Sequence, residues 1–350
     1  MCDDGRAGEA LVGAPRPVEG DAADPVALAP VDEVEVTTLI DNAFDGLLPD
    51  RPGISRPAFQ VGDVPSRFSE GGRTGASMVA EHGFSALVTV RRGAWRSTLL
   101  FDTGVSAEGM AGNAERLGVD VGDLQGVVLS HGHVDHTGGF EGLLRLRRGR
   151  GLPLTVPPAV WTRRRLTLPG RDPLLLPTLS AGALRREGFE VVERRHPSLL
   201  VGGSVLVTGE VDRTTEFERG MPPTHEAFDG STWRHDPLVV DDQALVVDVA
   251  GRGLVVVTGC GHAGVVNIVR HAMRLTGVDR LCALVGGFHL GGAAFEPNID
   301  PTVAALRALR PDLLVAGHCT GWRAQHTLAA ALPDAWVPSS SGSAYRLAAA

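Results

Sequence analysis

Lysine is absent from this 350-residue chain, and all 33 basic residues are arginine. A chain without lysine cannot form a lysine Schiff base, anchor pyridoxal phosphate or use the lysine of a Walker phosphate loop. Tyrosine occurs once, at Tyr345, so no other position can supply a tyrosine general acid. These two absences exclude several classes of enzyme before any motif is considered.

Cysteine is scarce as well, and long apolar runs are missing. The four cysteines, Cys2, Cys260, Cys282 and Cys319, lack the spacing of a disulfide framework or a CxxC metal site. The first ten residues, MCDDGRAGEA, are acidic rather than apolar, and no apolar run approaches the ~20 residues that span a bilayer. We therefore expect a cytoplasmic protein with reduced thiols and no membrane partner.

The charge and hydrophobic content set further bounds. The formal net charge of −8 and the pI of about 5.8 argue against nucleic acid as a partner. A hydrophobic content of 43% over 350 residues is enough for a large core that needs no disulfides. Residues 1–33 are rich in Ala, Gly, Pro and acidic residues, which predicts a disordered leader, and residues 34–350 are expected to form a single domain.

Hydrophobic patterning predicts strands followed by strand–helix units in both halves of the chain. A Gly-, Pro- and Arg-rich stretch at 48–77 is predicted to be a long loop. The predicted strands lie at 34–42, 84–90, 97–104, 124–130 and in a hairpin at 244–259, and the predicted helices at 111–117 and 265–277. This order fits an α/β fold in which two sheets pack together and helices cover them.

One segment gathers potential metal ligands. His131, His133, Asp135 and His136 lie within six residues, directly after the buried strand predicted at 124–130. Imidazole and carboxylate groups are good ligands for Zn²⁺ or Fe²⁺. Glycines within and after the segment allow a tight turn that points several side chains at one place. His131 and His133 are therefore expected to hold one metal, and Asp135 and His136 a second.

The segment SHGHVDHTGG resembles the signature of the metallo-β-lactamase superfamily, and LLFDTG upstream resembles another of its motifs. Further segments resemble the dihydropterin ribofuranosylaminobenzene phosphate synthase-like group, among them TGCGHAGVVN, GGFHL and GHCTG, and the resemblance runs from about residue 35 to 321. It implies an αββα fold, with two mixed β-sheets sandwiched between helices, and a centre of two divalent metal ions. Zinc is favoured, with Fe²⁺ or Mn²⁺ as alternatives. Members of that group often carry a His-Pro pair where this chain has Pro157-Pro158. If that histidine contributes to substrate binding, the substrate of this chain differs from theirs.

The resemblance also indicates where the remaining ligands lie. His262 is expected to complete the first metal site and His318 the second. Cys260 occupies the position of a bridging Asp in many superfamily members, and either ligates metal or is an ordinary buried cysteine. Asp241 and Asp242 are an alternative pair of oxygen donors or turn residues.

Other polar residues are given weaker roles. His289 follows an apolar strand and is proposed as a general acid, with a metal ligand or a structural role as alternatives. Asp102 is expected to accept hydrogen bonds from the metal-binding turn, His82 to be a partly buried histidine near the site, and Arg213 to clamp an anion. The remaining histidines are expected to lie outside any convergent site, with His271 on a helix surface: His196, His225, His235, His271 and His326.

These residues predict a hydrolase in which a metal-bridged hydroxide attacks an ester, a phosphoester or a related small anionic substrate. Asp135 would orient the attacking water or accept its proton, and His289 would protonate the leaving group. Two other reactions stay open on the same fold, a pterin synthase-like transfer that displaces pyrophosphate and iron-dependent redox chemistry. A degenerate binding protein is a fourth interpretation. The oligomeric state is open.

Overall fold

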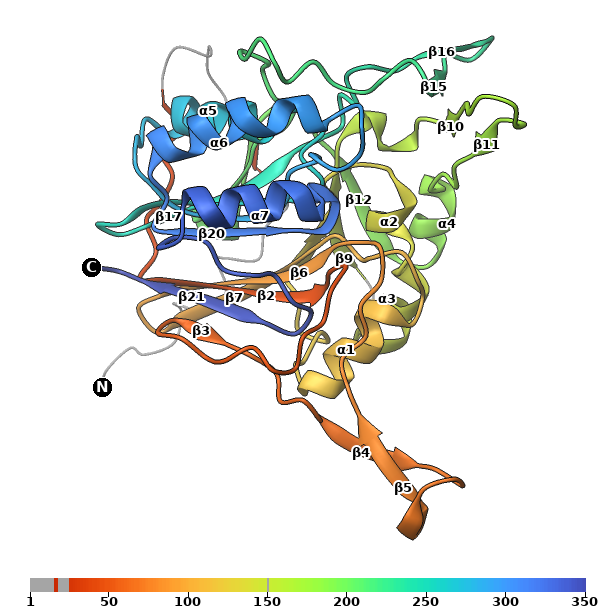
Figure 1. Ribbon diagram of the computed structural model, residues 1–350, viewed down its shortest axis with the longest axis vertical. Helices are drawn as coiled ribbons and strands as arrows, with labels where there is room; N and C mark the ends of the chain where they lie inside the picture. Colours follow the sequence, from red (N-terminus) through yellow and green to blue (C-terminus); the bar gives the residue numbers. More distant parts are fainter. Residues whose placement is uncertain (1–15, 18–24, 150) are drawn as a thin grey trace, which may run out of the picture.

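The structure is a computed structural model that describes residues 16–17, 25–149 and 151–350. Its elements form two large β-sheets covered by helices (Figure 1). One sheet has eight strands in the order β12-β9-β8-β7-β6-β2-β21-β3. The bounds are β12 Phe189–Glu193, β9 Leu152–Val156, β8 Gly126–Val128, β7 Trp95–Phe101, β6 Ser85–Arg92, β2 Glu33–Ile40, β21 Ala344–Ala348 and β3 Ile54–Ser55.

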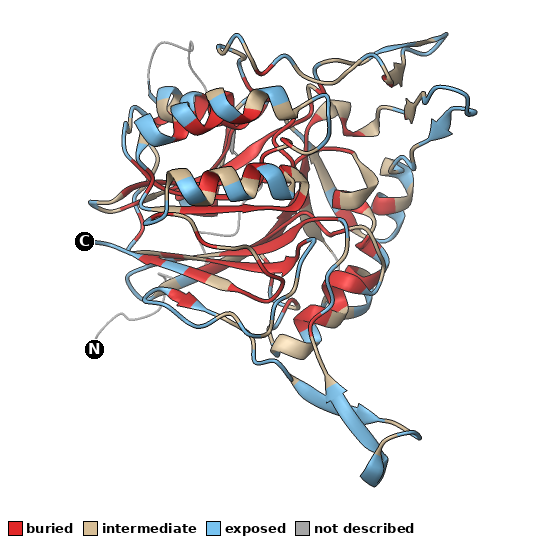
Figure 2. Ribbon diagram, viewed as in Figure 1, coloured by how far each residue is buried: buried red, intermediate tan, exposed pale blue. Residues whose placement is uncertain are grey.

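The second sheet has seven strands in the order β1-β13-β14-β17-β18-β19-β20. The bounds are β1 Arg16–Pro17, β13 Ser198–Leu200, β14 Val205–Val207, β17 Ala244–Val249, β18 Gly253–Thr258, β19 Leu281–Gly287 and β20 Leu313–Gly317. Valine-rich faces of the two sheets pack on each other, Val36 and Val88 from the first sheet lying in one cluster with Val247 and Val255 from the second. This apolar interface is the centre of the buried region in Figure 2.

Helices cover the outer face of each sheet. The helices α5 Val265–Thr276, α6 Ile299–Leu309 and α7 Trp322–Ala331 pack on the seven-stranded sheet through residues such as Ile268, Leu306 and Leu328. The helices α1 Gly109–Leu117, α3 Phe140–Leu146 and α4 Ala181–Arg186 pack on the eight-stranded sheet. This arrangement confirms the predicted αββα fold.

Two small sheets lie outside the sandwich. The strands β4 Gly62–Pro65 and β5 Arg73–Ala76 form a projecting hairpin (Figure 1), within the stretch predicted to be a loop at 48–77. That prediction was wrong at these strands because their exposed residues carry no hydrophobic alternation. The strands β10 Arg164–Leu166, β11 Leu174–Leu175, β15 His225–Phe228 and β16 Trp233–His235 form the other small sheet.

The predicted leader at 1–33 falls mainly outside the described residues. Its last part, 25–33, is packed on the sandwich, with Val26 donating to the carbonyl of Leu275 and Val31 fully buried. The structure therefore differs from the prediction there, because the segment PVALAPVDE carries apolar side chains, Val26 and Val31 among them, that pack on the sandwich. Within the described ranges, no helix is both long and apolar enough to cross a bilayer.

Candidate metal centre

The ends of strands from both sheets bring the candidate ligands together. Each of six strands is followed within three residues by a polar side chain of the site: β2 by Asn42, β7 by Asp102, β8 by His131, β18 by Cys260, β19 by His289 and β20 by His318. The loop after β8 turns tightly, and the short helix α2 Val134–Thr137 carries Asp135 and His136. A Cβ at Gly138 would overlap the carbonyl oxygen of Val105, so only glycine permits this packing.

The first cluster consists of His131, His133 and His262. The Nε2 atom of His131 lies 3.0 Å from Nδ1 of His133 and 3.2 Å from Nε2 of His262, and the last two atoms are 3.1 Å apart. Three nitrogens bound to one tetrahedral zinc at the usual bond length would be about 3.3 Å apart. The spacing of these nitrogens therefore fits a cation.

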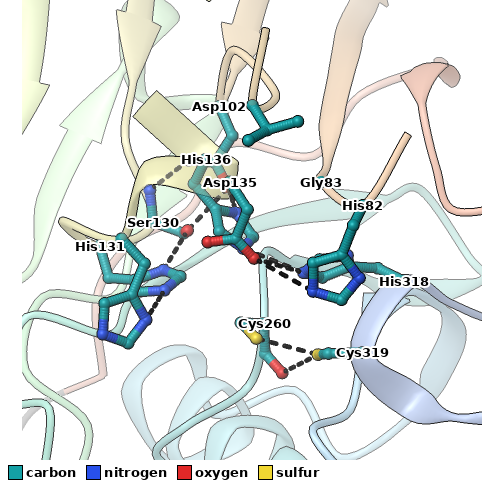
Figure 3. Close-up of polar contacts among 12 residues, drawn as sticks. His82, Gly83, Asp102, Ser130, His131, Asp135, His136, Cys260, His318 and Cys319 are labelled. Carbon is teal, nitrogen blue, oxygen red and sulfur yellow. Dashed lines mark hydrogen bonds and ion pairs between the residues drawn. The ribbon is translucent and has the colours of Figure 1, made fainter. Parts of the chain in front are cut away.

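The partner of His131 fixes which of its nitrogens faces the cluster. Ser130 donates its hydroxyl proton to Asp102 at 2.7 Å, so its oxygen accepts from Nδ1 of His131 at 2.9 Å. This leaves the lone pair of His131 Nε2 directed at the cluster. Figure 3 shows this relay running from Asp102 through Ser130.

His225 fixes His133 in the same way. Nδ1 of His225 lies 3.0 Å from the carbonyl oxygen of Asp236, which can only accept, so Nδ1 carries the proton. Nε2 of His225 then accepts from Nε2 of His133 at 3.0 Å, and the lone pair of His133 Nδ1 faces the cluster. The prediction that His225 lies outside any convergent site was therefore wrong.

The second cluster consists of Asp135, His136 and His318. Nε2 of His136 and Nε2 of His318 are 3.2 Å apart, and they lie 3.6 and 3.3 Å from Oδ2 of Asp135 (Figure 3). Nδ1 of His136 donates to Asp102 at 2.7 Å, and Nδ1 of His318 lies 2.9 Å from Oδ1 of Asn42. Nε2 of both histidines therefore faces Asp135, and Asp102 accepts hydrogen bonds from the turn as expected.

Cys260 lies between the two clusters. Its sulfur comes within 4.8 Å of the facing nitrogens of His131 and His262 on one side and of His136 and His318 on the other. This placement fits the predicted bridging position better than an ordinary core cysteine. Sequence reasoning missed Cys319, whose sulfur is 2.9 Å from that of Cys260. Cys319 could have been inferred from the sequence, because it directly follows the candidate ligand His318.

The charges of the site favour cation binding. Burial lowers the pKa values of His131, His133 and His262, so these imidazoles are neutral and keep the lone pairs that a metal requires. Burial acts against ionisation of His136 and Asp135 too, but Asp135 and Asp102 together raise the pKa of His136 to about 9, and His136 and His318 lower the pKa of Asp135. Without a cation His136 is therefore protonated, and a cation bound at this cluster would displace the proton from its Nε2.

Cys260 and Cys319 share their ionisation. Burial raises the pKa of Cys260. Burial also acts to raise the pKa of Cys319, but the Cys260 thiol, His318 and His289 lower it overall. Cys319 is therefore the sulfur favoured as a thiolate, the form of cysteine that binds metal.

His289 and His82 lie at the margin of the clusters. Nδ1 of His289 is 3.1 Å from the Cys260 sulfur, and its ring packs 4.2 Å from that of His262. His82 was expected to be partly buried, but it is exposed, with Nε2 3.8 Å from Oδ2 of Asp135. His289, His318 and Asp102 have positive φ angles of 45, 45 and 60°. Such strained backbone conformations are common among residues of functional sites.

Other candidate residues lie outside both clusters. Asp241 forms an ion pair with buried Arg164 and accepts from Gly132, so its oxygens are occupied. Asp242 accepts from the backbone of Ala263. Arg213 donates to the carbonyls of His262 and Leu238 rather than standing free as an anion clamp.

The remaining histidines differ from one another. His271 was predicted to lie on a helix surface but is buried, because it lies on α5 beside the buried residues Ile268 and Ala272, and its Nδ1 accepts from the backbone N–H of Asp212. His196, His235 and His326 are exposed and lie outside both clusters, as expected.

The chain has clear relatives. The profile of the Metallo-beta-lactamase superfamily matches residues 83–271. Over 250 residues the chain is 29% identical to 7,8-dihydropterin-6-methyl-4-(beta-D-ribofuranosyl)-aminobenzene-5'-phosphate synthase of Methanocaldococcus jannaschii, covering 71% of this chain and 83% of that protein. An uncharacterised protein of the same archaeon is 26% identical over 245 residues, covering 70% and 86%. Among solved structures, a metal-dependent hydrolase of the beta-lactamase superfamily superposes with a TM-score of 0.64 at 25% identity, covering 90% of this chain and 98% of that one.

Proposed function

Because this chain belongs to the metallo-beta-lactamase superfamily, we propose that it is a hydrolase that uses two divalent cations, with zinc favoured, on a small anionic ester or phosphoester. One observation carries the proposal. Five histidine nitrogens form two clusters within which neighbouring nitrogens are 3.0–3.2 Å apart, and Cys260 lies between these clusters. The ligands of the first cation would be His131, His133 and His262, and those of the second Asp135, His136 and His318.

Bound cations would supply Lewis acidity, which lowers the pKa of water and polarises a carbonyl or phosphoryl group. The side chain of Asp135 is 19% exposed and can accept a proton from the attacking water. Nδ1 of His289 faces Cys260, so Nε2 is the nitrogen left to protonate a leaving group. His82, exposed beside Asp135, can hold substrate at the entrance.

Group transfer is a second candidate, favoured by the 29% identity to a synthase. In that reaction an arylamine riboside, instead of water, attacks a pterin and displaces pyrophosphate. The same cations would stabilise the leaving pyrophosphate. Such a reaction requires the two organic substrates together and gives no product with water alone.

Metal analysis and substrate screening test the proposal together. Anaerobically purified protein should contain about two divalent cations per chain. It should hydrolyse at least one member of a panel of phosphoesters, lactones and thioesters. Turnover only with a pterin diphosphate and an arylamine riboside would support transfer, and bound iron with visible absorbance and oxidative turnover would support redox chemistry.

A matched pair of variants tests the ligand assignment. His133→Ala should lose the first cation and the activity while the fold persists. His326→Ala makes the same substitution at an exposed histidine outside both clusters and should keep both cations. If His133→Ala retains its full metal content, the first site is not where we place it.

A further inference from the structure

Two cysteines that are distant in the sequence meet beside the metal centre. The sulfur of Cys260 is 2.9 Å from that of Cys319, although the two residues are 59 positions apart (Figure 3). Both thiols are free. Because the sulfurs of a disulfide are about 2.05 Å apart, a movement of about 0.9 Å would join this pair.

The end of the seven-stranded sheet brings the two cysteines together. Cys260 lies two residues after β18 and Cys319 two residues after β20, and β19 lies between these strands. The last residue of β19 is Gly287. A Cβ there would lie 2.7 Å from the Cys319 sulfur and 2.6 Å from the carbonyl oxygen of Gly259. The absence of a side chain at Gly287 therefore lets the segments after β18 and β20 approach each other over the end of β19.

The described cysteines differ in their access to solvent. Cys319 is partly exposed, whereas Cys260 is 3% exposed. A small oxidant in solution therefore reaches Cys319 first, and Cys260 is the thiol placed to react with the oxidised sulfur. Cys282 is fully buried in the apolar core between the sheets. It lies near the start of β19, about 16 Å of extended strand from Gly287, and so is remote from the pair.

We propose that Cys260 and Cys319 form an oxidation site at which a peroxide converts the two thiols into a disulfide. With hydrogen peroxide, the Cys319 sulfur first attacks one oxygen, the O–O bond breaks, and Cys319 becomes a sulfenic acid as water leaves. The Cys260 sulfur then attacks the Cys319 sulfur. The S–O bond breaks, and the hydroxyl leaves as a second water with the proton of Cys260. Two thiols are oxidised by two electrons in total, and one peroxide is reduced to two waters.

Oxidation would change the metal centre, because the Cys260 sulfur lies between the two clusters of candidate ligands. A thiolate there can bind or bridge cations, whereas the sulfur of a disulfide is uncharged. Bound cations would in turn occupy the Cys260 sulfur and slow its oxidation. Only this effect on the cations rests on the proposed function, since formation of the disulfide needs neither a cation nor hydrolysis.

Peptide mapping tests the oxidation site directly. The full chain is treated with a chelator and then with about one equivalent of hydrogen peroxide, the stoichiometry of one disulfide. The remaining thiols are labelled with iodoacetamide in urea, and the tryptic peptides are analysed by mass spectrometry without reduction. We expect a linked pair of peptides that contain Cys260 and Cys319, and full labelling of both residues after dithiothreitol is added. Cys282 should stay labelled throughout and serves as the internal reference.

A matched pair of variants identifies the partners. Cys319→Ala should leave Cys260 labelled after the same treatment, because its partner is missing. Cys282→Ala also removes one cysteine, from the core, and should give the same linked peptides as the wild type. Zinc competition with a chelator measures the effect on the centre. The oxidised chain should bind zinc about tenfold or more weakly than the reduced chain, since the loss of a ligand exceeds the effect of losing an outer partner.

The outcomes separate this inference from the proposed hydrolysis. If peroxide leaves Cys260 and Cys319 labelled in the chelated wild type, or links either of them to another cysteine, the oxidation site is wrong. Loss of label at Cys282 to the same extent would also overturn it, because the reaction would then be unselective. Unchanged zinc affinity in the oxidised chain would overturn the link to the metal centre. If Cys319→Ala does not fold, the maps of the wild type and Cys282→Ala still decide, and they do so whether or not any ester is hydrolysed.

Discussion

Asp102 connects the two proposed metal sites, and its substitution by asparagine is the most informative change to the protein. The carboxylate is fully buried and accepts three hydrogen bonds of 2.7 Å each. Oδ1 accepts from the backbone N–H of Ser130. Oδ2 accepts from the Ser130 hydroxyl and from Nδ1 of His136 in the second cluster. The Ser130 oxygen in turn accepts from Nδ1 of His131 in the first cluster.

The asparagine amide has two orientations in this position, and each has a cost. If its oxygen keeps the N–H of Ser130, its NH₂ group faces the Ser130 hydroxyl and His136 Nδ1. The hydroxyl must then donate to His131 Nδ1, and His136 Nδ1 must accept. Both imidazoles consequently carry their proton on Nε2, which removes one lone pair from each metal site.

The opposite orientation keeps both tautomers but places NH₂ against the backbone N–H of Ser130. A buried donor left without an acceptor costs about 1–3 kcal/mol. The loss of an outer partner of a metal ligand weakens binding about 10–100-fold, which is about 1.4–2.7 kcal/mol. The metal-free variant can avoid the unpaired donor by adopting the first orientation, but in either orientation it replaces hydrogen bonds to a charged acceptor, worth about 1.5–3 kcal/mol each, by neutral ones worth about 0.5–1.5 kcal/mol.

We therefore expect Asp102→Asn to bind both cations about 10-fold or more weakly, and its metal-free form to be about 1 kcal/mol or more less stable. Competition with a chelator measures the first quantity, and urea unfolding of the chelated protein measures the second. Ser130→Ala is the matched control, because it removes the relay to His131 and leaves the bond from Asp102 to His136. It should weaken only the first site. Wild-type metal affinity and stability in Asp102→Asn would refute the proposed tautomers.

Two further predictions concern histidines at the edge of the centre. His225→Phe should weaken the first site about 10–100-fold and leave the second unchanged, because only His133 loses its acceptor; chelator competition measures this, and equal weakening of both sites would contradict it. His289→Ala should keep both cations and lower turnover by about 10²–10⁴-fold, with a smaller loss for weakly basic leaving groups. A loss independent of leaving-group basicity, measured with two substrates, would exclude His289 as the general acid.

The strands and helices that could be predicted from the sequence are those with a strong apolar pattern. The helix predicted at 265–277 is α5, and it ends at Thr276 because the next residue, Gly277, has a left-handed backbone conformation. The hairpin predicted at 244–259 is formed by β17 and β18. The hairpin of β4 and β5 was missed because its residues are exposed and therefore show no alternation. Residues 25–33 were missed for a related reason, since the apolar side chains of PVALAPVDE lie among prolines and follow no regular period.

The site residues, like the strands and helices, could be predicted where a strong apolar pattern marks the strand before them. His262, His289 and His318 each follow a buried apolar strand, and β18, β19 and β20 are parallel neighbours. Parallel strands end at the same edge, so the sequence position of each histidine already predicts where it lies.

His225 has no such signal. It begins β15, which pairs with β10 and β16 in a small sheet, and it meets His133, 92 residues away. No buried apolar strand precedes it to mark its position. The proposed cation ligands and Asp102 all follow buried apolar strands and can thus be inferred from strand patterns, whereas His225 reaches the site through long-range packing. Since His225 decides which nitrogen of His133 offers a lone pair, the affinity of the proposed first site depends in part on a residue that the sequence alone does not reveal.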